Sequence, residues 1–222
     1  MSVRIYSDDD EPQYHPAPKY TVGLDLGQTK DYTALCVLER HGEGEQVVFH
    51  ARHLQRFALG TPYPAIVASV AGMLKQPPLT GEKPRLAVDE TGVGAPVVDL
   101  FRQARLNASL HPIHITGGST VNYDRGVEYV PKRNLVSVVQ VALQTDRLKI
   151  ASALPEAGTL VRELQDFQVK ITDAANDTYG AWREGAHDDL VLAVALGLYV
   201  GKKRGEFVDV EPCSYSFRSL EW

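Results

Sequence analysis

The stretch YTVGLDLG, residues 20–27, decides the fold that the sequence predicts. Its apolar side chains indicate a buried strand over Tyr20–Leu26, and one acid, Asp25, interrupts them shortly before Gly27. A carboxylate inside an apolar strand is unfavourable unless a partner compensates it. Asp25 therefore either caps a turn that the glycine allows, or points from the end of the strand into a functional site.

The sequence around this strand predicts a layered α/β fold. Two more strands, Thr33–Glu39 and Gln46–Gln55, complete an antiparallel meander. The glycine-rich, polar stretch Thr116–Val130 predicts a mobile loop over a site. Elsewhere helices are expected at Pro64–Leu74, Ala95–Arg105, Lys132–Thr145, Leu160–Leu164 and Asp188–Val200, and strands at Arg85–Asp89, Leu110–Ile115, Phe167–Thr172 and Asp177–Trp182. This order predicts a mixed central sheet, with three antiparallel strands followed by parallel strands and helices on both faces.

Composition places the chain among ordinary globular proteins. Of its 222 residues, 44% are hydrophobic, which predicts one domain over residues 20–204 between a flexible leader at 1–19 and a tail at 205–222. The net charge of -5 argues against a basic protein that coats nucleic acid, but allows an enzyme with a local basic patch. Two cysteines argue against a disulfide scaffold, and no apolar run is long enough to span a membrane.

Two further acidic positions repeat the arrangement around Asp25. Asp89 ends a predicted strand and precedes a glycine turn, whereas strand alternation points the adjacent Glu90 the other way. Sites in open α/β sheets lie beyond the carboxyl ends of strands. Asp188 and Asp189 open the last predicted helix, where aspartate commonly caps a helix. We expect one of this pair to be the cap and the other to reach the site.

These four aspartates suit hard divalent cations. Mg²⁺ and Mn²⁺ prefer oxygen ligands, and two such ions roughly 3.5–4 Å apart can clamp the attacking and leaving oxygens of a phosphodiester. The pattern favours a metal-dependent endonuclease in which Asp25 binds both ions and Asp89 binds one of them. Asp188 or Asp189 binds the other ion, and the residues alone do not decide between the two.

In this order and spacing, the residues resemble a known family: the C-terminal nuclease domain of the large terminase subunit, the DNA-packaging motor of tailed phages. The resemblance covers residues 20–201 and rests on VGLDLG at 22–27, DYTAL at 31–35, VDETGVG at 88–94, VPKRNL at 130–135, DRLKI at 146–150 and HDDLVLA at 187–193. It implies an RNase H-like fold and two-metal cleavage of double-stranded DNA. The metal-binding acids that it implies are Asp25, Asp89 and Asp188, with Asp189 close by.

The resemblance also implies partners and a place of action. The partners are double-stranded DNA of a concatemeric viral genome, the terminase ATPase domain, the small terminase subunit and the portal protein, in the host cytoplasm. The chain has no glycine-rich phosphate loop ending in Gly-Lys-Ser/Thr, which such motors carry in an N-terminal ATPase domain. We therefore expect either an excised domain or a separately encoded nuclease, without an ATPase motif.

A nuclease must also neutralise phosphates, so basic residues near the predicted loop are candidates for DNA contact. Lys132 and Arg133 follow the glycine-rich stretch and open a helix, whose backbone N–H groups also favour anions. Arg125, inside that stretch, is the third candidate. Most surface cations are simply solvated, so these three are expectations for DNA contact and not members of the metal site.

Other classes of protein fit part of the pattern. Another RNase H-like nuclease, such as a resolvase or a transposase, would place its acids in the same order. An actin-like phosphotransferase would use DLGQT, residues 25–29, as a phosphate loop, but it needs a duplicated fold and has no place for the acids at 188–189. A non-enzymatic assembly module would not need all four aspartates.

Overall fold

The computed structural model describes residues 19–27, 31–92, 95–171, 177–181 and 188–202. The main sheet has the strand order β6-β7-β5-β4-β1-β2-β3-β8, and β9 pairs with β10 in a separate hairpin. The strands are β1 (Tyr20–Asp25), β2 (Ala34–His41), β3 (Val48–Arg56), β4 (Arg85–Asp89), β5 (Ser109–Thr116), β6 (Asn122–Asp124), β7 (Val127–Pro131), β8 (Leu148–Ile150), β9 (Phe167–Ile171) and β10 (Asp177–Ala181). The α-helices are α1 (Tyr63–Leu74), α2 (Ala95–Gln103), α3 (Lys132–Gln144), α4 (Ala157–Asp166) and α5 (Asp189–Gly201), and a short 3-10 helix spans Gly44–Gln46.

The first three strands form an antiparallel meander, and later strands extend it in parallel. β1 pairs antiparallel with β2, and β2 with β3. β4 joins β1 in parallel, β5 joins β4, and β7 joins β5, while β8 lies parallel to β3 at the other side of the sheet. The predicted α/β fold with a mixed sheet is therefore confirmed. Because β1, β4, β5 and β7 run the same way, their carboxyl ends share one edge.

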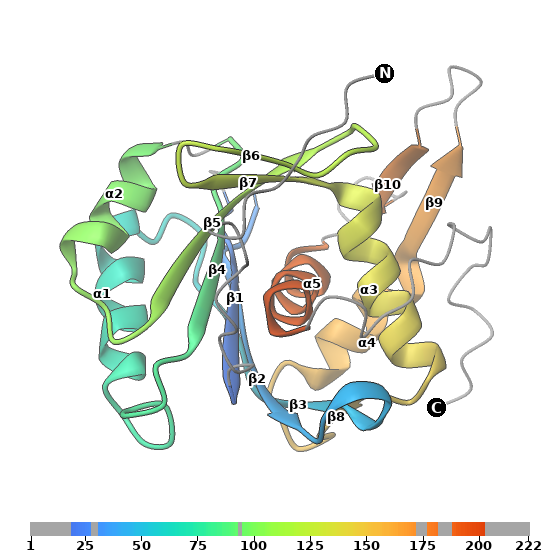
Figure 1. Ribbon diagram of the computed structural model, residues 1–222, viewed down its shortest axis with the longest axis horizontal. Coiled ribbons are helices and arrows are strands. Elements are labelled where there is room, and N and C mark those ends of the chain that lie inside the picture. Colours follow the sequence, from blue (N-terminus) through green and yellow to red (C-terminus); the bar gives the residue numbers. More distant parts are fainter. Residues whose placement is uncertain (1–18, 28–30, 93–94, 172–176, 182–187, 203–222) are drawn as a thin grey trace, which may run out of the picture.

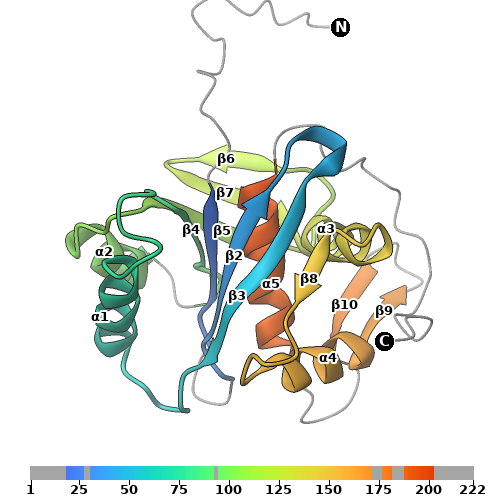
Figure 2. The same cartoon turned by 90° about the horizontal axis from the view of Figure 1, so that it is seen from below.

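Helices cover both faces of the main sheet, as predicted. α1 and α2 lie on one face, and α5 lies on the other with α3 and α4 packed beyond it (Figure 1). α5 contacts β1, β2 and β4 on its sheet side and α3 and α4 on its outer side. After a 90° turn, α5 is seen to run behind β2 and β3 (Figure 2). In the part of the chain that the structure describes, no helix has the length and apolar character that a membrane crossing requires.

The central helix α5 lies very close to β1. All of its residues except Tyr199 are buried, because its sequence is apolar on every side after Asp189. A Cβ built on Gly23 would lie 1.8 Å from the carbonyl oxygen of Ala193 and 2.7 Å from the backbone nitrogen of Gly197. Only glycine in the strand allows this approach of helix to sheet. The contact fixes the position of α5 relative to the end of β1.

Two expectations about the sheet need correction. Most of Thr116–Val130 is not a loop, because β6 and β7 pair there as an antiparallel hairpin. Its turn has left-handed backbone angles at Arg125 (φ 47°) and Gly126 (φ 83°), as the primed hairpin turns require. The short strand β8 is not in the prediction at all. The predicted leader, apart from Lys19, and the predicted tail lie outside the described residues.

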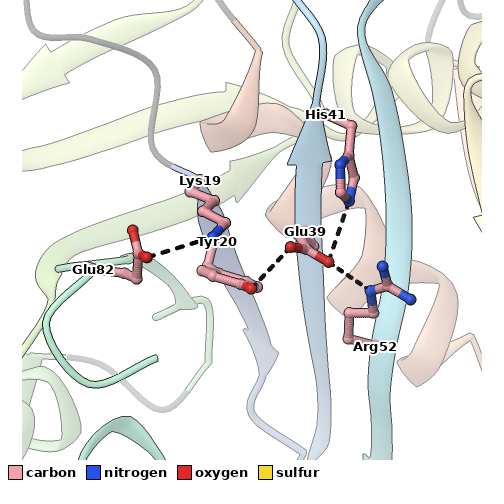
Figure 3. A network of polar contacts seen from close by, with 6 residues as sticks. All are labelled: Lys19, Tyr20, Glu39, His41, Arg52 and Glu82. Atoms are coloured by element: carbon pink, nitrogen blue, oxygen red, sulfur yellow. Dashed lines mark hydrogen bonds and ion pairs between the residues drawn. The ribbon is translucent and has the colours of Figure 1, made fainter. Parts of the chain in front are cut away.

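A polar network ties β1, β2 and β3 together at the end of the sheet away from Asp25 (Figure 3). The hydroxyl of Tyr20 donates to Oε1 of Glu39 at 2.9 Å, and Nε of Arg52 donates to Oε2 of Glu39 at 2.7 Å. His41 Nε2 lies 3.2 Å from Oε2 of the same carboxylate. Burial raises the pKa of Glu39, but the hydrogen bonds from Arg52, Tyr20 and His41 outweigh burial and lower it to about 2. We call these contacts the Glu39 network.

Candidate metal centre

Two aspartates meet where neighbouring strands end. Asp25 is the last residue of β1, and Asp89 is the last residue of β4. The two strands run parallel with Leu24 opposite Val88, so their final residues are neighbours. Both aspartates are buried, at 8% and 7% exposed, and their carboxyl groups lie within hydrogen-bonding reach of each other. The structure thus brings together the two acids that the sequence placed at strand ends.

The amino end of α5 brings two more aspartates toward Asp25. Asp189 is the first residue of α5 and is buried, and Asp188 directly precedes it. Both are close enough to influence the ionisation of Asp25, Asp189 more strongly than Asp188. We call Asp25, Asp89, Asp188 and Asp189 the aspartate cluster. Its assembly depends on the close packing of α5 against β1.

The aspartate cluster holds more negative charge than its surroundings compensate. Burial, followed by the charges of the three other aspartates, raises the pKa of Asp25 well above its usual value. The ammonium group of Lys132 lowers that pKa, but only in part. A bound cation would offset the repulsion and favour the ionised carboxylates. The electrostatics of the cluster therefore suit a cation-binding site.

Asp89 is held in place by the turn that follows β4. The backbone N–H of Thr91 donates to Oδ1 of Asp89 at 2.8 Å, and the Thr91 hydroxyl accepts from the backbone N–H of Ile115 at 2.7 Å. Burial raises the pKa of Asp89 against the opposing effects of the Thr91 hydrogen bonds and the charge of His114. The turn thus fixes the carboxylate beside the end of β5.

Lys132 lies against the aspartate cluster. It is the first residue of α3, directly after β7, and its Nζ donates to Oδ2 of Asp188 at 3.0 Å. Its side chain is 26% exposed, so it is neither fully buried nor freely solvated. From the sequence alone, Lys132 is expected only to contact DNA phosphates. The structure adds a second role for it as a partial counterion of the aspartates.

The donor set of the aspartate cluster consists of carboxylate oxygens, which suits Mg²⁺ and Mn²⁺. Among the residues that the structure describes, no group of three or more His, Cys, Asp or Glu side chains is arranged so that it could hold a metal ion. The fit to a cation therefore rests on the chemistry of the donors and on the repulsion between the carboxylates, which the charge of an ion would offset. The residues that would hold it are Asp25, Asp89 and either Asp188 or Asp189.

The cap of α5 comes from another helix, which corrects the expectation that one of the two aspartates provides it. Asp188 occupies the N-cap position, but its side chain makes no capping hydrogen bond. Instead, Oε2 of Glu163 in α4 accepts hydrogen bonds from the backbone N–H groups of Leu190 at 2.9 Å and Val191 at 3.1 Å. The carboxylate of Asp188 therefore stays directed at Lys132 and the site.

Glu163 and Arg56 are candidate functional residues that the sequence analysis missed. The carboxylate of Glu163 pairs with the guanidinium of Arg56, the last residue of β3. Burial raises the pKa of Glu163, and the charge of Arg56 and a hydrogen bond from Val191 lower it. Burial outweighs these two effects, so the pKa is about 7. One feature of the sequence could have revealed Glu163. It is an acid on the apolar side of an amphipathic helix, where it shares the buried face with Leu160 and Leu164.

The remaining predicted residues are not all brought to the site. Arg133 donates to the carbonyl oxygen of Ser119 at 3.1 Å, next to Lys132. Arg125 lies at the turn of the β6–β7 hairpin with a side chain that is 93% exposed. The five residues of β7 separate that turn from Lys132, so Arg125 does not share a patch with it. Glu90 lies 3.6 Å from His114 rather than within the aspartate cluster.

Comparisons with known proteins concern the family and the fold of the chain. The sequence model of the terminase RNase H-like domain family matches residues 22–199. No curated protein matches the chain. The fold is similar to that of the large terminase nuclease from thermophilic phage G20c, at 19% identity and a TM-score of 0.58, over 84% of each chain. It is also similar to the human cytomegalovirus terminase nuclease domain soaked with Mn, at 16% identity and a TM-score of 0.54, over 91% of each chain.

A third structure shows how the chain compares in length with a larger protein. The HK97 bacteriophage large terminase matches at 16% identity with a TM-score of 0.52. The match covers 83% of this chain but 39% of that protein. The chain therefore corresponds in extent to nuclease domains rather than to the whole HK97 protein. At these identities, the solved structures establish a shared fold.

Proposed function

The chain belongs to the family of terminase RNase H-like domains, and from this membership we propose that it is a metal-dependent endonuclease that cuts double-stranded viral DNA during packaging. The observation that carries the proposal is the aspartate cluster, in which carboxylates from β1, β4 and the amino end of α5 meet. Buried carboxylates that repel one another destabilise a fold. A bound cation would offset this repulsion, and a catalytic role would explain why four aspartates are placed together.

The roles proposed for the four aspartates follow from their places in the cluster. Asp25 is close enough to the three others for their charges to raise its pKa, and it is the ligand that two ions would share, whereas Asp89 would bind one ion. Asp188 or Asp189 would bind the other. When bound, Mg²⁺ or Mn²⁺ supplies an activated water and stabilises the departing oxygen of a phosphodiester. Two similar structures support this choice of metal. The large terminase nuclease from thermophilic phage G20c was solved with bound magnesium, and the large terminase nuclease domain from bacteriophage SPP1 was solved with bound Mn.

Basic side chains beside the cluster are proposed to hold the DNA backbone. Lys132 is the first residue of α3 and Arg133 the second, and Arg133 contacts Ser119 in the segment that links β5 to β6. The positive end of a helix favours phosphate oxygens at this position. Lys132 can exchange its contact with Asp188 for a phosphate once a divalent cation compensates the aspartates. Arg125, at the far turn of the hairpin, is a separate contact point for DNA.

The setting proposed for this activity is a packaging motor in the host cytoplasm. The partners proposed there are the terminase ATPase domain, the small terminase subunit and the portal protein. The match to part of the longer HK97 large terminase supports a role beside other terminase components. The chain contains no Gly-Lys-Ser/Thr phosphate loop, so the ATP-driven step is assigned to a partner domain.

Incubation with supercoiled plasmid tests the proposal. With Mg²⁺ or Mn²⁺ the 222-residue chain should nick and linearise the plasmid, and with EDTA it should not. Asp25→Asn should abolish cleavage, because the ligand that both ions would share is lost. Without metal at pH 8, this variant should be at least as heat-stable as the wild type. Burial and neighbouring acids raise the pKa of Asp25, so the ionised form destabilises the fold as the pH rises above the usual aspartate value.

The outcomes separate the proposed function from its alternatives. Cleavage by a folded Asp25→Asn variant would remove Asp25 from the mechanism. Nucleotide hydrolysis without plasmid cleavage would instead favour a phosphotransferase. Preference for four-way junctions over linear duplex would favour a resolvase. The family match argues against both alternatives, since it covers the whole succession of strands and helices from β1 to α5.

A further inference from the structure

The first turn of α5 needs hydrogen-bond acceptors, because the leading N–H groups of a helix have no partner within it. The usual acceptor is the side chain of the N-cap residue. In α5 that residue is Asp188, whose side chain makes no capping bond. Glu163 in α4 provides the acceptor instead, and its Oε2 accepts hydrogen bonds from the backbone N–H groups of both Leu190 and Val191. Its side chain is 5% exposed, so the cap is a buried contact.

Arg56 joins this cap to the aspartate cluster. Its guanidinium pairs with Oε1 of Glu163 and lies 3.5 Å from Oδ2 of Asp189. The same group stacks over the ring of Tyr32, with 4.9 Å between the guanidinium carbon and the ring centroid. A planar guanidinium held on three sides fixes the groups that it contacts relative to one another. Arg56 thereby links the cap of α5 to the Asp189 carboxylate through an ion pair.

From these contacts we infer that Glu163 and Arg56 are positioning residues, which tune the affinity of the aspartate cluster for divalent cations without touching the ion. Glu163 takes over the capping role that would otherwise occupy Asp188. The carboxylate of Asp188 therefore stays directed at Lys132 and the aspartate cluster. The inference rests on the proposed function, because it assigns a task within that same metal centre.

The expected effects follow the chemistry of each substitution. Glu163→Ala removes the acceptor of two amides and the partner of Arg56, so Asp188 can rotate to cap the helix and withdraw from the site. Replacing groups that orient metal ligands commonly weakens metal binding about 10- to 100-fold. Glu163→Gln retains an acceptor oxygen but loses the charge that pairs with Arg56. Its loss of metal affinity should therefore be smaller than that of Glu163→Ala. Arg56→Lys should lose less affinity than Arg56→Met, because it retains the charge.

Mn²⁺ titration of the full 222-residue chain, by calorimetry or by the EPR signal of free Mn²⁺, measures these effects. Glu39→Gln is the matched control. Glu39 is also a buried carboxylate paired with an arginine, but it lies about 17 Å from Asp25 along the strands, at five residues of roughly 3.3 Å each. The control should keep its Mn²⁺ dissociation constant within about twofold of the wild type, even if it lowers the melting temperature.

Hydrogen exchange gives a readout that needs no metal. The amides of Leu190 and Val191 should exchange slowly in the wild type and much faster in Glu163→Ala, whereas the middle of α5 stays protected. A folded Glu163→Ala variant with wild-type Mn²⁺ affinity would overturn the inference. If the Glu163 variants do not fold, equal affinities of Arg56→Lys, Arg56→Met and wild type would overturn it instead. A wild-type chain that binds no Mn²⁺ would defeat the proposed function and the inference together, although slow exchange at the two amides would still establish the cap.

Discussion

Replacing Gly23 by alanine is expected to destabilise the fold and to separate the aspartate cluster. The added Cβ would lie 1.8 Å from the carbonyl oxygen of Ala193 and 2.7 Å from the nitrogen of Gly197, whereas ordinary contacts begin near 3.4 Å. Both atoms belong to the backbone of α5, so no side-chain rotation relieves the overlap. In a close-packed interior the helix must retreat by roughly 1.5 Å.

The size of the effect follows from that retreat. Overpacking a core typically costs about 1–3 kcal/mol, and we expect about 3 kcal/mol or more because α5 contacts β1, β2 and β4 at once. In a domain of this size 1 kcal/mol lowers Tm by about 2–4 °C, so Tm should fall by roughly 6–12 °C. Asp189 lies one helical turn before Ala193, so the retreat also moves it away from Asp25. Mn²⁺ affinity should therefore fall as well.

Thermal and urea denaturation, followed by circular dichroism, measure the loss of stability. Gly72→Ala is the matched control, because Gly72 lies inside α1 and a Cβ there would meet no atom within 4 Å. Alanine is favoured over glycine within a helix by about 0.5–1 kcal/mol, so the control should be as stable as the wild type or more so. A Gly23→Ala protein within about 0.5 kcal/mol of the wild type would refute the claim that this approach requires glycine.

Two further predictions concern charge. The depressed pKa of Glu39, about 2 against a usual 4.5, stabilises the fold above pH 4.5, and this contribution is lost as the pH falls toward 2. Between pH 5 and pH 3 the wild type should therefore lose about 1–2 kcal/mol more stability than Glu39→Gln in urea titrations, and equal losses would contradict the Glu39 network as its source. Charge reversal at Lys132 and Arg133 together should weaken binding of duplex DNA in fluorescence anisotropy and reduce the slope of log affinity against log salt by roughly two. Unchanged affinity would discard that patch.

Apolar patterning was sufficient to predict the elements that are buried on both faces. The strand Arg85–Asp89 has the predicted bounds, and the last helix differs from its prediction by one residue at each end. The hairpin of β6 and β7 gave no such pattern, because Asn122–Asp124 is exposed throughout and has no apolar alternation. Its turn was also hidden, since Arg125 occupies a left-handed position that Asn or Asp usually signals.

Of the residues in the candidate site, some could be predicted from the sequence and others could not. Asp25 and Asp89 were visible in the sequence because an acid that ends an apolar strand is conspicuous on its own. The partnership of Arg56 with Glu163 was not visible, since the two residues are 107 positions apart and neither is unusual without the other. The same holds for Lys132, whose contact with Asp188 arises only when α3 and α5 pack together. Tertiary contacts of this kind decide which acid caps a helix and which remains available.

The central place of α5 also sets an order of events while the protein is made. The helix is the last described element of the chain, yet it packs against β1, the first. Contacts between segments so far apart in sequence form late in folding, because closing the long intervening chain is entropically unfavourable. Until α5 leaves the ribosome, the main core stays open and two of the four aspartates are missing from the site. A chain that lacks α5 therefore lacks Asp189 and the packing that positions the aspartate cluster, so the step that completes the core also completes the candidate site.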